Sequence, residues 1–341
     1  MSAERPRLTP PAAAPPRVVS ITATGAYVPE QIRTNHDLEK MVDTSDEWIF
    51  SRTGIRQRHI ADETQAASDL AVQAARRALA GARLAPEAVD LILVATCTPD
   101  MTFPSTACFV QQQLGAKQAA CLDVSAACSG FLYALDLGRQ YVASGQMETV
   151  LVIGAEKMSS VMDWTDRTTC VLFGDGAGAA VLQPSPAAYG LLPAVLGADG
   201  SLSNLLSIPG GGSRHPPSPE MLAQKRHLLK MSGREVFKHA VTNMAAAAQE
   251  ALRRNGARIE EVACIIPHQA NARIIQAIGQ RIGAPIEQFY LNVERYGNTS
   301  AASVIMALDE AARGGRVRRG DLVLLVVFGG GFTWAATLLE W

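Results

Sequence analysis

Short apolar segments alternate along the chain with longer segments that have the spacing of amphipathic helices. Residues 89–97, VDLILVATC, form a compact apolar run rich in β-branched side chains, which indicates a buried strand. Residues 104–115 open with proline and close with glycine, an arrangement typical of a helix. Strands at 119–125 and 149–157 then flank a helix at 128–145. The alternation predicts an α/β fold in which helices pack on buried sheets.

The same order of elements recurs in the second half of the chain. A strand at 262–270 is followed by helices at 271–283 and 298–315 and by a strand at 321–331. These four segments match the order of those that begin at residue 89, so the sequence indicates a duplicated βα unit. If the two copies pack with pseudo-twofold symmetry, the ends of equivalent elements converge between them, where ligands of α/β folds commonly bind.

Three parts of the chain follow from this pattern. Residues 1–17 are rich in proline and alanine, so we expect a disordered extension. Residues 18–184 and 185–341 then form the two copies, each of a common domain size. A stretch rich in glycine, proline and serine begins the second copy.

Composition excludes several classes of function. The 341 residues carry 31 basic and 32 acidic side chains, a net charge of −1, so no overall basic field attracts nucleic acid or an anionic membrane. No apolar run reaches the length of about 18–20 residues that spans a bilayer, and the first residues do not resemble a secretory signal. We therefore expect a cytoplasmic protein.

Six cysteines are present, and none forms a CxxC pair, so a zinc site or a thioredoxin-like pair is not indicated. In a reducing compartment they remain free thiols, and five of them are interpreted as small buried hydrophobic residues. Cys128 differs because it begins a predicted helix among the small side chains of SAACSG. A helix N-terminus favours the thiolate, which is the nucleophilic form.

Two polar residues of the second copy are expected near this thiol. His268 ends a predicted strand in PHQAN, and Asn298 begins the helix that corresponds to the one after Cys128. Each has a plainer interpretation, as a hydrogen-bonded core histidine and as a helix cap. Their convergence with Cys128 favours nucleophilic catalysis.

Two glycine-rich segments do not indicate a nucleotide site. FGDGAGAAVL and FGGGFTWAATLLEW are both followed by strand-like runs, and neither has the spacing of a dinucleotide or P-loop motif. The first is interpreted as close backbone packing. The second, a turn after the last buried strand, places a backbone N–H where it can bind an oxyanion.

The ordered motifs SAACSGF, GDGAGAAV, PHQAN, YGNTSAAS and GGGFTWA resemble those of the β-ketoacyl-acyl carrier protein (ACP) synthase III family. The similarity covers nearly the whole chain after residue 17 and includes SDEWIFSRTGIRQRHI and KMSGREVFKHAV. It implies a thiolase-like fold with α-β-α-β-α layers. It also implies the joining of an acyl starter from coenzyme A (CoA) to malonyl-ACP with release of carbon dioxide, the first condensation of fatty-acid synthesis.

The resemblance assigns roles to the candidate residues. Cys128 is the acylated nucleophile, and the backbone N–H groups of Cys128 and Gly330 form the oxyanion hole. His268 and Asn298 serve the decarboxylating step, in which each donates a hydrogen bond to the malonyl thioester oxygen. No metal or cofactor is implied beyond the two substrates.

Contacts to CoA are also implied by the resemblance. Trp48, Arg52 and Arg167 match residues that bind the nucleotide, since arginine and tryptophan can enclose a purine ring. Trp48 can equally be a partly buried aromatic of a helix. Phe103 matches a residue that closes the acyl pocket of the partner subunit in a homodimer, and its alternative is a hydrophobic contact at a helix entry.

A basic face for the acidic carrier protein is expected at Lys238, Arg273 and Arg281. The family often has two adjacent basic residues where this chain has Gln280-Arg281, so the same three residues can equally form an ordinary solvated surface.

Other functions remain open on sequence alone. A thiol hydrolase also uses cysteine, histidine and asparagine, although its local signature is absent here. A specialised condensing enzyme or acyltransferase of secondary metabolism has the same residues, whereas a non-catalytic partner subunit needs no reactive thiol. The starter acyl group is not evident from the sequence.

Overall fold

The computed structural model describes residues 16–187 and 190–341. Most of the expected N-terminal extension, residues 1–15, lies outside the described residues. Arg17, the last residue of that extension, is held in place, because its side chain donates to the carbonyls of Val142 and Met147 and pairs with Glu148. Arg17 is therefore anchored to the folded chain.

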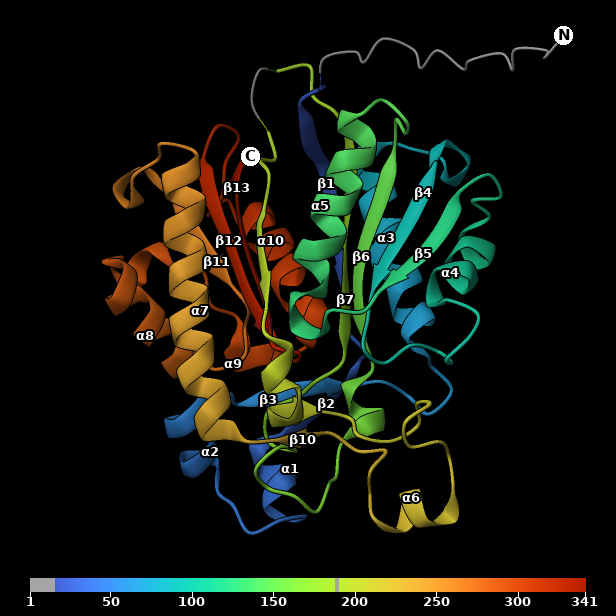
Figure 1. Cartoon of the computed structure of the whole chain (residues 1–341), viewed down its shortest axis with the longest axis vertical. Helices are drawn as coiled ribbons and strands as arrows, with labels where there is room; N and C mark the ends of the chain where they lie inside the picture. The colour runs from blue at the N-terminus through green and yellow to red at the C-terminus, as the bar shows by residue number, and fades with distance from the viewer. Residues whose placement is uncertain (1–15, 188–189) are drawn as a thin grey trace, which may run out of the picture.

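Two sheets form the centre of the molecule (Figure 1). The first has five strands in the order β1 (Val19–Tyr27), β7 (Gly176–Pro184), β6 (Val150–Glu156), β4 (Leu91–Ala95) and β5 (Ala120–Val124). The second has four strands in the order β11 (Cys264–Pro267), β12 (Leu322–Gly329), β13 (Thr333–Glu340) and β8 (Val195–Ala198). Strands β4 and β6 are buried along their whole length, as their apolar runs predict.

Helices form the three remaining layers (Figure 1). Helices α3 (Ala67–Ala82) and α4 (Thr106–Leu114) cover the outer face of the first sheet, and α7 (Gly233–Arg254) and α8 (Ala272–Ile282) that of the second. Helices α5 (Gly130–Ala143) and α10 (Ser303–Arg313) lie between the sheets and bury the central core. The predicted α-β-α-β-α arrangement is confirmed.

The second sheet repeats the strand order of the first. Strands β8, β13, β12 and β11 take the places of β1, β7, β6 and β4, and a single bridge from Ile265 to Phe289 stands where β5 would pair. The expected boundary between residues 184 and 185 falls just after β7. The division into two halves stays a prediction, since both sheets share the central helical layer.

Smaller elements cover the end of the sheets where the candidate residues gather. They are β2 (Gln31–Thr34), α1 (Asn35–Glu39), α2 (Asp46–Thr53), β3 (Gln57–Ile60), β9 (Leu206–Ser207), α6 (Pro219–Ala223), β10 (Lys230–Met231) and α9 (Val293–Tyr296). Among the described residues, no helix combines the length and the apolar character needed to cross a bilayer.

Candidate active site

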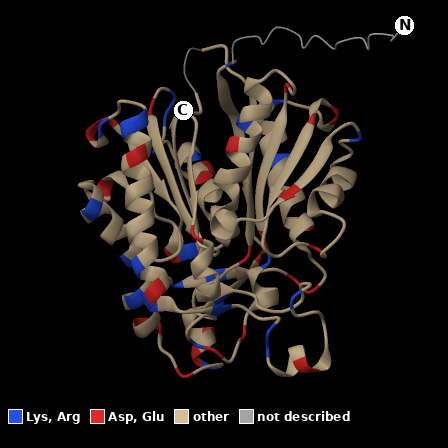
Figure 2. Ribbon diagram, viewed as in Figure 1, with Lys and Arg blue, Asp and Glu red and all other residues tan. Residues whose placement is uncertain are grey.

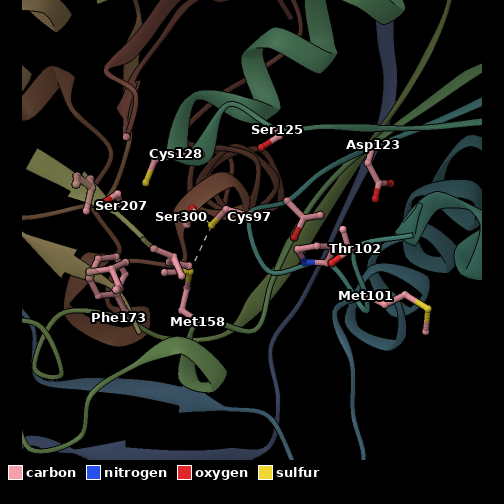
Figure 3. A pocket seen from close by; sticks show the side chains of 17 residues that line it. Cys97, Met101, Thr102, Asp123, Ser125, Cys128, Met158, Phe173, Ser207 and Ser300 are labelled. Atoms are coloured by element: carbon pink, nitrogen blue, oxygen red, sulfur yellow. Dashed lines mark hydrogen bonds between the residues drawn. The ribbon is translucent and has the colours of Figure 1, made fainter. Parts of the chain in front are cut away.

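Two cavities meet at Cys128. The first has a volume of about 450 Å³, and its lining includes Cys97, Met101, Met158 and Ser300 (Figure 3). The second, of about 220 Å³, is a passage lined by α2 and α7. It extends from Trp48 and Arg52 to Cys128, His268 and Asn298. The structure therefore brings the predicted thiol, imidazole and amide to one place, at the inner end of a passage.

Cys128 lies in a single 3₁₀ turn, residues 127–129, which connects β5 to α5. Ala127 just before it has a φ of 45°, in the left-handed region that an alanine rarely adopts, which turns the chain sharply at this point. Gly329 at the end of β12 supports the turn. A Cβ atom there would lie 2.7 Å from the Cys128 backbone nitrogen, so only glycine allows this approach. Gly330, the predicted oxyanion donor, lines the first cavity beside Cys128.

The Cys128 side chain is only 7% exposed. Burial raises the pKa of the thiol to about 12, and the negative charge of Glu156 acts in the same direction, whereas the nearby Ser300 hydroxyl opposes both. Burial thus acts against the helix start, which favours the thiolate. Loss of water outweighs the helix end here, so the thiol needs a proton acceptor before it can attack.

His268 follows β11, and its backbone N–H donates to the carbonyl of Val326 at 2.8 Å. Its Nδ1 atom lies 2.5 Å from Oγ of Ser303, the first residue of α10. That hydroxyl also accepts from the backbone N–H of Gln269 at 3.3 Å. Burial lowers the pKa of His268 to about 3, so the imidazole is neutral at physiological pH and Ser303 orients its ring.

Asn298 is oriented by its own turn. Its Oδ1 atom accepts from the backbone N–H of Ser300 at 2.8 Å, which identifies the oxygen of the amide, because an N–H group can only donate. The Nδ2 group is thereby left as the donor of a side chain that lines the passage. Asn298 and neutral His268 can thus present two polar groups to one substrate atom.

The three expected CoA residues cluster at the outer end of the passage. The guanidinium of Arg52 lies 4.6 Å from the ring centre of Trp48, and that of Arg167 lies 5.4 Å from it. Arg167 also pairs with Asp43 at 3.1 Å. Trp48 is half-buried in α2, so both its predicted stacking and its structural role remain possible in one position.

Phe103 does not line either cavity, although its neighbours Met101 and Thr102 line the first. Its side chain is 85% exposed, so the alternative of a hydrophobic contact at the entry to α4 is wrong. An aromatic ring this exposed beside a cavity rim is what a residue serving a second subunit would show in a single chain.

Lys238, Arg273 and Arg281 are all exposed on α7 and α8, which pack together on the outside of the second sheet (Figure 2). The same helices line the passage with Val236, Phe237 and Ile274. The three predicted carrier-binding cations therefore lie on the two helices that also line the passage, and Arg281 links α8 to α7 through a hydrogen bond to Thr242.

Four functional candidates were missed by the sequence reasoning. Ser300 and Ser303 lie inside the motif YGNTSAAS, where only the asparagine drew attention. Glu156 ends the apolar run of β6, and a charged residue at the end of a buried strand was a usable signal. Cys97 looked like another core thiol, yet it lines the first cavity together with Cys128. In the described residues, no group of three or more His, Cys, Asp or Glu side chains is arranged to hold a metal.

Comparisons with known proteins identify the family of this chain. The family model described as 3-oxoacyl-[acyl-carrier-protein (ACP)] synthase III matches residues 122–200, and its C-terminal counterpart matches residues 252–341. A β-ketoacyl-[acyl-carrier-protein] synthase III from Desulfitobacterium hafniense is 54% identical over 95% of this chain and 98% of its own length.

Solved structures show the same fold. The 3-oxoacyl-[acyl-carrier-protein] synthase III of Aquifex aeolicus is 49% identical, with a TM-score of 0.88 over 95% of this chain and 100% of that one. The priming β-ketosynthase of the R1128 polyketide pathway is 37% identical, with a TM-score of 0.89 over 97% and 98% of the two chains. The layered fold and these likenesses define an acyltransferase of the thiolase-like condensing class. The chain belongs to the β-ketoacyl-ACP synthase III family.

Proposed function

We propose that this enzyme transfers an acyl group from CoA to Cys128 and condenses it with malonyl-ACP, as the first elongation step of fatty-acid synthesis. The observation that carries the proposal is the meeting of Cys128, His268 and Asn298 where a narrow passage joins a wider cavity. The passage suits the extended arm of a CoA or carrier thioester, and the cavity of about 450 Å³ suits the acyl group.

In the first step, the Cys128 sulfur attacks the thioester carbon. The resulting oxyanion accepts hydrogen bonds from the backbone N–H groups of Cys128 and Gly330, which the turn at Ala127 and the end of β12 hold together. Such fixed donors stabilise charge that develops only in the transition state.

In the second step, malonyl-ACP loses carbon dioxide and leaves an enolate on its thioester oxygen. The Nδ2 group of Asn298 and the Nε2–H of neutral His268 donate to that oxygen. Ser303 supports this tautomer, because its hydroxyl can donate to Nδ1 while it accepts from the backbone of Gln269. The enolate carbon then attacks the acyl group on Cys128.

The substrates are proposed to reach the site from one side. Trp48, Arg52 and Arg167 bind the nucleotide of CoA at the outer end of the passage, and Lys238, Arg273 and Arg281 attract the acidic carrier protein to the neighbouring face. These steps use side chains and backbone groups alone, so we propose that no cofactor or metal takes part.

We propose a homodimer as the working form. Strand β5 is an edge strand, and Leu122 on it is 45% exposed. Met101 and Phe103 nearby are 48% and 85% exposed. An open edge beside exposed apolar side chains favours pairing with a second copy, which would bring Phe103 to the partner's cavity. The enzyme is further proposed to work in the cytoplasm, where its six free cysteines stay reduced.

A second candidate function is the priming of a polyketide or other specialised pathway. The likeness to the R1128 priming ketosynthase supports it, since 37% identity over 97% of the chain accompanies the same fold. The two functions share the chemistry at Cys128 and differ in the starter and in the carrier protein.

We predict that Cys128 is the single cysteine that becomes acylated. The other five thiols lack its position at the meeting point of the two cavities, although Cys97 lines the first of them. The protein should be incubated with a panel of acyl-CoA thioesters of different length and branching, and each cysteine peptide weighed. Label on Cys97 with none on Cys128 would show that the mechanism is wrong, and the preferred starter would separate the two pathways.

Replacement of Arg52 by alanine should weaken the use of acyl-CoA about 10–150-fold, the range of one charge-assisted contact. Reaction from the same acyl group on pantetheine, which lacks the nucleotide, should change little. The measurement is kcat/KM for both donors. Equal losses with both donors would mean that Arg52 supports the structure of α2 and does not bind nucleotide.

A further inference from the structure

Glu156 is a buried carboxylate for which the mechanism above has no use. It ends β6, is 0% exposed, and has no cation within ion-pairing distance among the described residues. Its oxygens instead accept hydrogen bonds from a ring of neutral groups. These are the hydroxyls of Thr96, Thr98 and Ser300, the backbone N–H groups of Cys97, Thr98 and Ala301, and the Cys97 thiol. An isolated buried charge is costly, so its presence beside a nucleophile indicates a function.

Ser300 connects this carboxylate to the nucleophile. Its Oγ atom lies 2.9 Å from Oε1 of Glu156, and Ser300 lines the first cavity together with Cys128. The Cys97 sulfur lies 3.7 Å from the same hydroxyl, and Figure 3 shows the three side chains facing the cavity. An ionised carboxylate can only accept, so the Ser300 hydroxyl donates to Glu156 and leaves its lone pairs for the Cys128 thiol.

The charges of this cluster favour proton transfer within it. Burial raises the pKa of Glu156 and of both thiols, Cys97 and Cys128. The adjacent Lys157 does not offset this, because its ammonium group is bonded to the carbonyls of Asp62 and Gln65. Ionising Cys128 while Glu156 stays ionised would place two negative charges together in a buried site. Moving the thiol proton to Glu156 keeps the total at one negative charge.

We propose that Ser300 and Glu156 are the proton path of Cys128: Glu156 takes the thiol proton through the Ser300 hydroxyl during acylation and returns it during condensation. The inference rests on the proposed function, in which Cys128 is the nucleophile. It makes Ser300 a catalytic residue that exchanges a proton with the reacting thiol, and Glu156 the proton store behind it.

Acylation exchanges one thioester bond for another and moves one proton to Glu156. A bond forms between the Cys128 sulfur and the acyl carbon, and the bond from that carbon to the CoA sulfur breaks. The thiol proton passes to Ser300 Oγ as the proton of Ser300 passes to Glu156. CoA leaves as a thiolate and takes a proton from water in the passage. Glu156 then stays neutral while Cys128 carries the acyl group.

Condensation reverses the path. The enolate carbon bonds to the acyl carbon, and the bond to the Cys128 sulfur breaks, which frees a thiolate. Ser300 gives this thiolate its proton and regains one from Glu156, so both return to their first state. One proton from water is consumed in each turnover, which is the number that decarboxylation of a malonate carboxylate requires.

His268 is a poorer acceptor for the same proton. Burial lowers the pKa of the imidazole, whereas it raises that of Glu156, so the proton is held more strongly by the carboxylate. The hydrogen bond between the Ser303 hydroxyl and Nδ1 of His268 also leaves the Nε2–H group free for the malonyl oxygen. Acylation of Cys128 and decarboxylation of malonyl-ACP therefore use separate groups.

The test compares rates of Cys128 acylation from acyl-CoA in a single turnover, read by the mass of the protein. Glu156→Gln should load about 100-fold more slowly at pH 7, the usual contribution of a general base. Because the thiol must then ionise to water, this deficit should shrink about tenfold for each pH unit above 7. Asp175→Asn is the matched control, since Asp175 is also 0% exposed and bonded to Ala61 and Ser159 but does not contact Ser300. It should load at the wild-type rate.

Ser300→Ala breaks the same path and should reproduce the deficit of Glu156→Gln and its dependence on pH. Wild-type loading at neutral pH by either variant would overturn the proposal. A deficit of equal size at every pH would overturn it as well, because it would indicate a structural role. If the variants do not fold, the wild type in mixtures of light and heavy water provides the test. If two protons move together in the acylation step, the loading rate should depend on the deuterium fraction along a curve. The absence of any isotope effect would overturn the path.

Experiments on the wild type and on Glu156→Gln distinguish failure of the proposed function from failure of the proton path. If acyl-CoA leaves no acyl group on Cys128 of the wild-type enzyme, the proposed function itself is wrong. If Cys128 of the wild type is acylated and Glu156→Gln is acylated equally fast, only the proton path is wrong.

Discussion

Replacement of Asn298 by alanine should leave acylation of Cys128 nearly intact and slow decarboxylation of malonyl-ACP about 10²–10³-fold, the cost of one oxyanion-type donor. The reason is that thioester attack uses backbone N–H groups near Cys128, whereas the enolate oxygen needs the Asn298 amide. Two signals are to be followed in the same sample: acyl-Cys128 by mass, and carbon dioxide released from malonyl-ACP.

Asn271→Ala is a suitable control for this prediction. Asn271 also lines the passage, but its side chain caps α8 and bonds to the backbone of Arg52. It should affect binding and stability more than the ratio of the two steps. If Asn298→Ala decarboxylates normally yet cannot be acylated, the assignment is reversed and Asn298 belongs to the first step.

The fold was predictable because its central strands are buried on both faces. Strands such as β4 and β6 are short apolar runs between helices that have clear end signals, and the recurrence of this order revealed the second sheet. Two details were not predictable. Cys128 lies in a separate 3₁₀ turn that precedes α5, and Phe289 makes only one bridge where a fifth strand would stand. Both depend on tertiary packing, which local sequence patterns do not contain.

Site residues that belong to recognisable motifs could be predicted from the sequence. Residues that act by positioning or protonating those residues were harder to predict. Cys128 and Asn298 precede the equivalent helices α5 and α10, and His268 follows the buried strand β11, so all three lie at the inner end of one passage. The raised pKa of Cys128 was not predicted, since the sequence shows a helix start but not how much water the surrounding cavity walls exclude. Glu156 and Ser303 were missed because their roles come from contacts with residues far away in the chain.

The remaining prediction concerns the stability of the folded chain in acid. The pKa of His268 is lowered from 6.5 to about 3 by burial, so the unfolded chain binds a proton at this residue that the folded chain does not. A lowered pKa contributes stability that is complete above the unfolded value and is lost as the pH falls toward the folded value. A pH of about 4.5 lies roughly two units below the pKa of 6.5 in the unfolded chain. The resulting loss is about 3 kcal/mol of unfolding free energy.

His268→Asn removes the titrating group and keeps a polar side chain of similar reach. Between pH 7 and pH 4.5, the loss of unfolding free energy should therefore be about 3 kcal/mol smaller for this variant than for the wild type. This holds even if the variant is less stable at pH 7. Urea unfolding at the two pH values measures both chains, and His36→Asn serves as the control because His36 lies on the surface, where its side chain is 73% exposed. Parallel losses in the wild type and in His268→Asn would mean that water reaches the imidazole and that His268 is not held neutral by burial. In that case the neutral donor assigned to the decarboxylating step would lose its physical basis, because an imidazole in contact with water is protonated as the pH falls below 6.5.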